Sequence, residues 1–265
     1  MTDPRPLSNL RALFFDVFGT LVDWEGSVSR QLKEEARRPG GSNFDGVDWV
    51  EFTRQWRKGY MTRTREIANG APGPGNIDEL HLEILNTLLD NPSHAAVASA
   101  WPSEEKRKEL CQVWHRLDAW PDVQEGMDAL KKLDPPVLLA SLSNGSLRLL
   151  VDLSRHSSLP FDALFSGDLL SSYKPNPKMY LGASALLGFD EEARERGEVG
   201  MVASHVYDLR AAAEHGFRTI YIPRRTEDVG EPEVRAKSEG GEVDVVLDPA
   251  EGGLGRLCEL LRPTQ

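Results

Sequence analysis

The spacing of apolar residues divides the chain into a helical stretch and an alternating stretch. The first apolar run, Arg11–Val17, has the unbroken hydrophobicity of a buried strand. Between Asp23 and Trp120, apolar residues recur every three or four positions, which is typical of amphipathic helices, and strand patterns are almost absent. The pattern predicts helices over Ser27–Arg38, Val47–Ala68, Ile77–Leu89 and Pro102–Leu117.

Beyond Trp120, short apolar runs alternate with helical patterns. Strands are predicted at Val137–Leu142, Ala163–Ser166, Val199–Ala203, Thr219–Ile222 and Val243–Leu247. Helices are predicted at Asp122–Leu133, Ser146–Arg155, Pro177–Leu187, Tyr207–His215 and Leu254–Leu261. This alternation predicts βαβ units and a parallel sheet covered on both faces.

We therefore expect an α/β fold with a Rossmann-like parallel sheet core and an inserted all-helical cap. The core would comprise residues 1–22 and 120–265, and the cap residues 23–119. A cap placed after the first strand would cover the carboxyl edge of the sheet and exclude water from a site there. The segment Arg224–Glu242 is rich in Gly, Glu and Arg without periodicity, so we interpret it as a surface loop.

Composition narrows the choice of partners and compartment. The formal net charge of −11 argues against binding to nucleic acid or anionic membranes. No apolar stretch approaches the roughly 20 residues that span a bilayer, and Met1–Pro6 lacks the apolar region of a signal peptide. Cys111 and Cys258 lack metal-ligand spacing and are expected to be reduced thiols. We expect a cytoplasmic protein in which individual Arg and Lys residues attract any small anion.

Polar residues follow several of the predicted strands. Asp16 ends the first strand and precedes a Gly19-Thr20 turn, at the sheet edge where open α/β folds place their chemistry. Ser143 and Asn144 follow the second strand and would form either an anion site or an ordinary helix start. Lys174 would keep the Asp16 carboxyl ionised, unless it is a solvated surface residue.

Together with Arg57 in the cap, these motifs resemble the haloacid dehalogenase (HAD) superfamily, and within it the type II (S)-2-haloacid dehalogenases. The resemblance implies that Asp16 is a covalent nucleophile, held by Thr20 and Lys174, with Asp208 holding Lys174. It implies that Ser143 and Asn144 bind a substrate carboxylate and that Arg57 accepts a halide. The remaining substrate-binding residues implied are Phe18, Trp56, Tyr60, Tyr180 and Tyr207, with Trp56 and Tyr60 belonging to the cap core or the pocket wall.

Two departures separate this chain from the superfamily's phosphatases. Phe18 stands where those enzymes carry the Asp that protonates a leaving alkoxide, and Ser204 stands where they carry a metal-binding Asp. A tight Mg²⁺ site is therefore not expected, and neither a metal nor another cofactor is predicted. Among dehalogenases the departure is His205, which replaces an Asn thought to position water. His205 would place or activate that water, or would be structural and bond a neighbouring loop. Ala203, in place of a Ser, leaves the water-activating geometry open.

The predicted reaction is metal-independent hydrolysis of short 2-haloalkanoic acids to 2-hydroxy acids, through an ester on Asp16, with halide as the second product. The alternatives are a HAD-family hydrolase with a non-haloacid substrate, a Mg²⁺-dependent phosphatase, or a non-catalytic binding protein. By analogy with dehalogenase relatives, a homodimer is also predicted.

Overall fold

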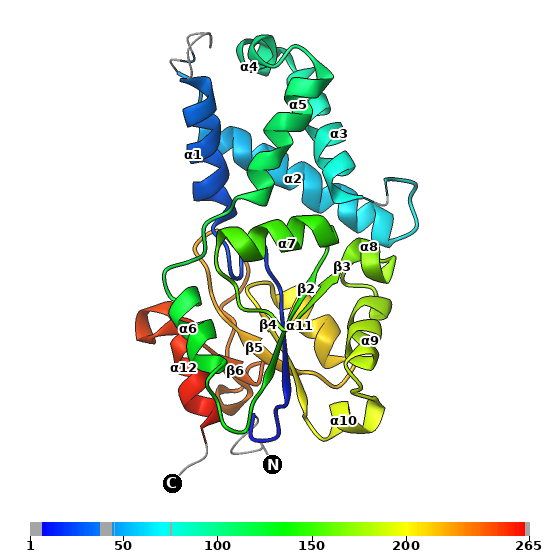
Figure 1. Cartoon of the computed structure of the whole chain (residues 1–265), viewed down its shortest axis with the longest axis vertical. Helices are drawn as coiled ribbons and strands as arrows, with labels where there is room; N and C mark the ends of the chain where they lie inside the picture. Colours follow the sequence, from blue (N-terminus) through cyan, green and yellow to red (C-terminus); the bar gives the residue numbers. More distant parts are fainter. Residues whose placement is uncertain (1–6, 38–43, 45, 75, 263–265) are drawn as a thin grey trace.

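A six-stranded parallel sheet forms the centre of the part of the chain that the structure describes. The computed structural model describes residues 7–37, 44, 46–74 and 76–262 (Figure 1). The strands follow the order β3-β2-β1-β4-β5-β6. They comprise β1 (Ala12–Phe15), β2 (Leu138–Ser143), β3 (Ala163–Ser166), β4 (Val199–Ala203), β5 (Arg218–Tyr221) and β6 (Val245–Val246). The predicted α/β fold and its parallel sheet are confirmed.

Strand β1 lies at the middle of the sheet because all four of its residues are apolar and fully buried. It pairs with β2 on one side and with β4 on the other. Leu13 and Phe15 pack into one hydrophobic cluster, and Ala12 and Phe14 pack into a second cluster on the opposite face. The strand order therefore reverses between β1 and β4, which is where open α/β sheets leave a crevice for ligands.

Helices cover both faces of the sheet. The cluster that contains Phe15 also holds apolar residues of α6 (Val123–Leu130), α7 (Leu147–His156) and α12 (Gly253–Leu261). The cluster that contains Phe14 holds residues of α8 (Gly167–Leu170), α9 (Pro177–Leu186), α10 (Glu191–Glu195) and α11 (Val206–Ala213). Apolar strands with both faces covered are what the alternating pattern predicted.

The helices between Trp24 and Cys111 gather at one end of the molecule, above the carboxyl edge of the sheet (Figure 1). We call them the cap, and we retain residues 23–119 as its proposed extent. They are α1 (Trp24–Ala36), α2 (Trp49–Ala68), α3 (Ile77–Leu89), α4 (Ala95–Ala100) and α5 (Glu104–Cys111), and α5 continues into a 3₁₀ turn, Gln112–His115. Arg38, the predicted end of the first cap helix, and the N-terminal segment Met1–Pro6 lie outside the described residues.

Helix α2 is the cap element that matters most for the site. Asp48 caps its first turn by accepting hydrogen bonds from the backbone N–H groups of Val50 and Glu51. Its buried aromatic residues pack into the cap, with the Trp56 ring centroid 5.5 Å from that of Trp114. Within the described residues, no helix has the length and apolar character needed to cross a membrane.

Candidate active site

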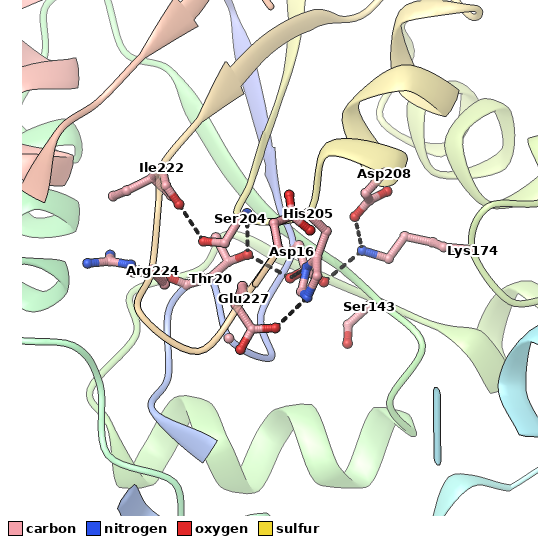
Figure 2. Close-up of polar contacts among 12 residues, drawn as sticks. Asp16, Thr20, Ser143, Lys174, Ser204, His205, Asp208, Ile222, Arg224 and Glu227 are labelled. Atoms are coloured by element: carbon pink, nitrogen blue, oxygen red, sulfur yellow. Dashed lines mark hydrogen bonds and ion pairs between the residues drawn. The ribbon is translucent and has the colours of Figure 1, made fainter. Parts of the chain in front are cut away.

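The polar residues predicted from the sequence meet at the switch point of the sheet (Figure 2). Asp16 follows β1 directly, Ser143 ends β2, and His205 stands between β4 and α11. Lys174 comes from the loop between α8 and α9. Parallel strands bring Asp16, Ser143 and His205 to one edge, the loop brings Lys174 to the same edge, and the cap lies over it.

The Asp16 carboxylate is buried and has several donors. Thr20 Oγ1 donates to Oδ2 at 2.7 Å, and Lys174 Nζ donates to Oδ1 at 2.7 Å. The Ser204 backbone N–H donates to Thr20 Oγ1, which directs the hydroxyl hydrogen towards Asp16. Burial alone would raise the pKa of Asp16, but the charges of Lys174 and of the adjacent His205 hold it well below its usual range. Asp16 is therefore ionised, as a nucleophile must be.

Lys174 lies between two carboxylates. Its Nζ is 2.7 Å from Asp16 Oδ1 and 2.5 Å from Asp208 Oδ2. Burial favours the neutral amine, but the charges of Asp16 and Asp208 raise the pKa of Lys174, so the ammonium persists. Burial and the charge of Asp16 raise the pKa of Asp208, and the Tyr180 hydroxyl donates to its Oδ1 at 2.5 Å.

His205 links Asp16 to a carboxylate that the sequence analysis did not include. Its Nε2 lies 2.6 Å from Glu227 Oε2, and its Nδ1 lies 3.3 Å from Asp16 Oδ2. Burial alone would lower the pKa of His205, but the close contact with Asp16, the hydrogen bond to Glu227 and the charges of both acids raise it to about 10. In the free enzyme the ring is therefore an imidazolium at neutral pH.

A cavity of about 270 Å³ opens onto Asp16 from the cap side. Six of the predicted substrate-binding residues line it: Phe18, Arg57, Tyr60, Ser143, Asn144 and Tyr207. The Arg57 guanidinium carbon is 4.7 Å from the Tyr60 ring centroid and 5.6 Å from the centroids of both Phe18 and Trp24. In the part of the chain that the structure describes, no carboxylate forms an ion pair with Arg57, so its charge is available to an anion in the cavity.

Comparison with known proteins places this architecture in a family. The family model described as haloacid dehalogenase-like hydrolase matches residues 10–216. The chain belongs to the haloacid dehalogenase-like hydrolases.

Relatives of this hydrolase include two bacterial enzymes. It is 28% identical to (S)-2-haloacid dehalogenase 4A of Burkholderia cepacia over 232 residues, covering 83% of this chain and 85% of the relative. It is also 28% identical to the (S)-2-haloacid dehalogenase of Pseudomonas sp. (strain YL), covering 81% and 83%.

Among solved structures, this chain is similar to L-2-haloacid dehalogenases. The L-2-haloacid dehalogenase PA0810 superposes with a TM-score of 0.78 at 34% identity, covering 95% of this chain and 98% of that one. The defluorinating L-2-haloacid dehalogenase Rha0230 superposes with a TM-score of 0.78 at 30% identity, covering 99% of each chain.

Two residues predicted to bind substrate in this dehalogenase-like hydrolase do not line the cavity, although the cap core was one of the two positions predicted for Trp56. Trp56 is fully buried in the cap and donates from Nε1 to the His81 carbonyl oxygen at 3.1 Å, so it supports the cap core and does not line the cavity. Tyr180 is fully buried against the sheet, does not line the cavity, and contacts the site only through Asp208. Asn144 lines the cavity, but its Oδ1 also accepts the Lys174 backbone N–H at 2.6 Å and so fixes the lysine.

The surface-loop interpretation of Arg224–Glu242 is wrong for its first residues. Arg224 is buried and donates to Asp122 at 2.6 Å, and Glu227 is buried against His205. Later residues do face solvent, since Val229 is 81% exposed. No local signal marks Glu227, because its burial depends on contacts with residues distant in the chain.

The donor set around Asp16 does not suit a divalent cation. The Lys174 ammonium already bonds both buried carboxylates, Asp16 and Asp208. Ser204, at the position of the absent metal-binding Asp, donates its hydroxyl to the Ile222 carbonyl oxygen at 2.6 Å. A cation at this position would be repelled by the ammonium, and Ser204 would offer it no carboxylate.

Proposed function

We propose that this protein hydrolyses short 2-haloalkanoic acids to 2-hydroxy acids through an ester on Asp16, without a metal. One observation carries the proposal: an ionised, buried carboxylate and an arginine enclosed by aromatic rings face the same cavity. The first group suits attack on carbon, and the second suits a large, weakly hydrated anion. The named activities of the relatives support the same reaction.

In the first step, the substrate carboxylate binds at Ser143 and Asn144. The Ser143 Oγ accepts the Gly145 N–H at 3.2 Å, which leaves the hydroxyl hydrogen available to the substrate. An Asp16 oxygen then bonds to C2, and the carbon–halogen electron pair leaves with the halide towards Arg57. Because a halide needs no proton, Phe18 in place of an acid costs this step nothing.

In the second step, water attacks the carbonyl carbon of the Asp16 ester. The bond between that carbon and the ester oxygen that Asp16 supplied breaks, which releases the 2-hydroxy acid, and the water oxygen completes the restored carboxylate. Inversion at C2 follows from in-line attack in the first step. His205 is the proposed group that places or activates the water.

The test is halide release from (S)-2-chloropropionate with and without EDTA, beside a Mg²⁺-supplemented phosphate-ester assay. We expect halide release that EDTA does not change and no release of phosphate. Absence of halide from the folded protein, or loss of halide release on chelation, would contradict the proposal. Mg²⁺-dependent phosphate release without halide would favour the phosphatase alternative.

A further inference from the structure

Glu227 is held in the site more firmly than an incidental loop residue. Its Oε2 accepts from His205 Nε2 at 2.6 Å, and its Oε1 accepts from Trp24 Nε1 at 2.6 Å and from the Thr226 hydroxyl at 2.7 Å. Its side chain is 6% exposed. The hydrogen bond and charge of His205 outweigh burial and lower the pKa of Glu227 to about 2, so it is a carboxylate and Nε2 of His205 carries the proton.

The surrounding chain is shaped to admit this carboxylate. Gly19, in the turn after the nucleophile, has φ +84°, and a Cβ built there would lie 2.3 Å from Glu227 Cδ. A side chain at this position would expel Glu227. Arg225 ties the same loop to the cap by donating to Glu25 at 3.0 Å and to Asp23 at 3.1 Å. Two separate segments therefore fix Glu227 beside His205.

We propose that Glu227 is a positioning residue that sets His205 as the base for hydrolysis of the Asp16 ester. The inference rests on the proposed function. Because Glu227 binds the Nε2–H, the other ring nitrogen is the one directed at Asp16 (Figure 2). His205 Nδ1 is buried and, among the described residues, makes no well-aligned hydrogen bond. A carboxylate, an imidazole and a reacting centre in this order form the arrangement used by hydrolytic triads.

Esterification of Asp16 changes the charge that His205 experiences. Before the reaction the ring lies between two carboxylates, with Asp228 and the Tyr207 ring nearby. The ester removes the negative charge of Asp16, so the imidazolium loses one of its two counter-ions and releases its Nδ1 proton to cavity water. The neutral ring, still oriented by Glu227, can then accept a proton, which the imidazolium could not do before the ester formed.

The proton balance closes over one cycle. Water oxygen bonds to the Asp16 carbonyl carbon while one water proton passes to His205 Nδ1. The intermediate collapses by breaking the bond to the ester oxygen attached to C2, and that alkoxide takes the proton from Nδ1. The new Asp16 carboxyl then protonates His205, which restores the starting ion pair. Each turnover releases one halide, one hydroxy acid and the proton lost to solvent.

The experiment separates the two half-reactions in the Glu227→Gln variant by rapid-quench halide measurement and mass spectrometry of the protein. We expect a burst of about one halide per site at nearly the wild-type rate, then turnover slowed by at least about 10²-fold, as for loss of an effective general base. The ester should accumulate on Asp16. The matched control is Glu233→Gln, which alters an exposed carboxylate of the same loop that pairs with Arg235 and should turn over normally.

Other outcomes would overturn the inference. Normal steady-state turnover of Glu227→Gln would remove the positioning role, and equal slowing of the burst and of hydrolysis would make Glu227 merely structural. If Glu227→Gln does not fold, Trp24→Phe removes one donor to Glu227 but keeps a ring beside Arg57. It should slow hydrolysis more than the burst, and the reverse would contradict the proposal. A wild-type protein that releases no halide would reject the proposed function itself.

Discussion

At the scale of residues, the site is a balance of buried charges. Asp16, Asp208 and Glu227 are neutralised by Lys174 and His205, with Arg57 nearby. Removing one partner from such a set leaves an uncompensated charge in a low-dielectric interior, which is costly. Single substitutions here therefore affect folding as well as chemistry, and the two effects must be measured separately.

The nucleophile gives the first prediction. Asp16→Asn keeps the shape of the side chain but removes the charge that attacks carbon, so we expect halide release to fall by about 10⁴-fold or more. Asp128→Asn, at an exposed position of α6, is the control. Near-normal halide release by Asp16→Asn would exclude an aspartyl ester.

Lys174 gives a prediction about pH. The depressed pKa of Asp16 means that this carboxylate stabilises the fold above the unfolded-state pKa, and that the stability is lost as pH falls towards the folded-state pKa. Lys174→Met should lower the free energy of unfolding at pH 7 by about 3–5 kcal/mol and should flatten its loss between about pH 5 and pH 2. Urea unfolding across pH measures both. Lys178→Met, at an exposed site, should reproduce neither effect.

Arg57 gives a prediction about the leaving group. Arg57→Lys keeps the positive charge but replaces a weakly hydrated plane with a compact, strongly hydrated ammonium. We expect the halide burst to slow by at least about 10-fold, with little change in melting temperature. Single-turnover halide release measures this, and Arg63→Lys on the same helix but away from the cavity lining is the comparison. An unchanged burst would place the halide elsewhere.

At the scale of elements, apolar runs in the sequence located the strands well. All six predicted strands are present, because in a covered parallel sheet the central strands are largely buried and the apolar run is the signal. Short helices were not predicted: α4, α8 and α10 have 6, 4 and 5 residues, too few to show periodicity. The predicted helix Pro102–Leu117 instead begins at Glu104 and tightens into a 3₁₀ turn after Cys111.

Site residues whose position depends on the neighbouring sequence could be predicted, whereas those placed by contacts with distant parts of the chain could not. Asp16 follows its strand directly, so the strand pattern was enough to identify it. Glu227 contacts Trp24, 203 residues away, and His205, 22 residues away, and no pattern near Glu227 encodes those contacts. Trp56 and Tyr60 lie one helical turn apart, yet only Tyr60 faces the cavity, because the direction of each side chain depends on how the cap packs.

A histidine between the cap and the core gives a prediction at this scale. His115 Nδ1 is 2.9 Å from Asp152 of α7, and its Nε2 is 3.2 Å from Asp78 of α3. Burial lowers the pKa of His115, but hydrogen bonds to both acids raise it overall. The resulting stability is complete below about pH 6.5 and is lost as pH rises through the folded-state pKa.

The wild-type protein should therefore lose more stability between pH 6 and pH 9 than His115→Gln does. Urea unfolding at several pH values makes the comparison. Arg148, which also pairs with Asp152, is unchanged in the variant and does not titrate in this range. Equal losses in both proteins would show that the bridge between α3 and α7 does not depend on protonation of His115.

At the scale of the whole molecule, a chain with net charge −11 repels the small anions that it is proposed to bind. The cavity lining includes two arginines of α2, of which Arg57 is buried and Arg65 is exposed. The cytoplasmic location and the homodimer that the sequence suggested stay predictions.

Arg65 should therefore guide substrate towards the cavity. Arg65→Gln is expected to lower kcat/KM a few-fold at low salt, to leave kcat unchanged, and to weaken the dependence of kcat/KM on ionic strength, because screening acts on exposed charges. Steady-state kinetics at several salt concentrations measures this. A salt dependence identical to that of the wild type would assign Arg65 no part in attraction.

The cavity face of α2 has a consequence for the range of substrates. Arg57, then Tyr60 and Met61, then Thr64 and Arg65, line the cavity on successive turns of α2, and Asn69 follows at its C-terminal cap, so the lining positions are spaced by about 5 Å along the helix. The length of the substrate's alkyl chain would then determine which of these residues it contacts. A larger residue at Thr64 would shorten the alkyl chain that the cavity accepts, and a smaller residue at Met61 would lengthen it. Neither change would move the groups that perform the chemistry. Selection for new acids in the laboratory would then begin on this helix, far from the nucleophile in sequence.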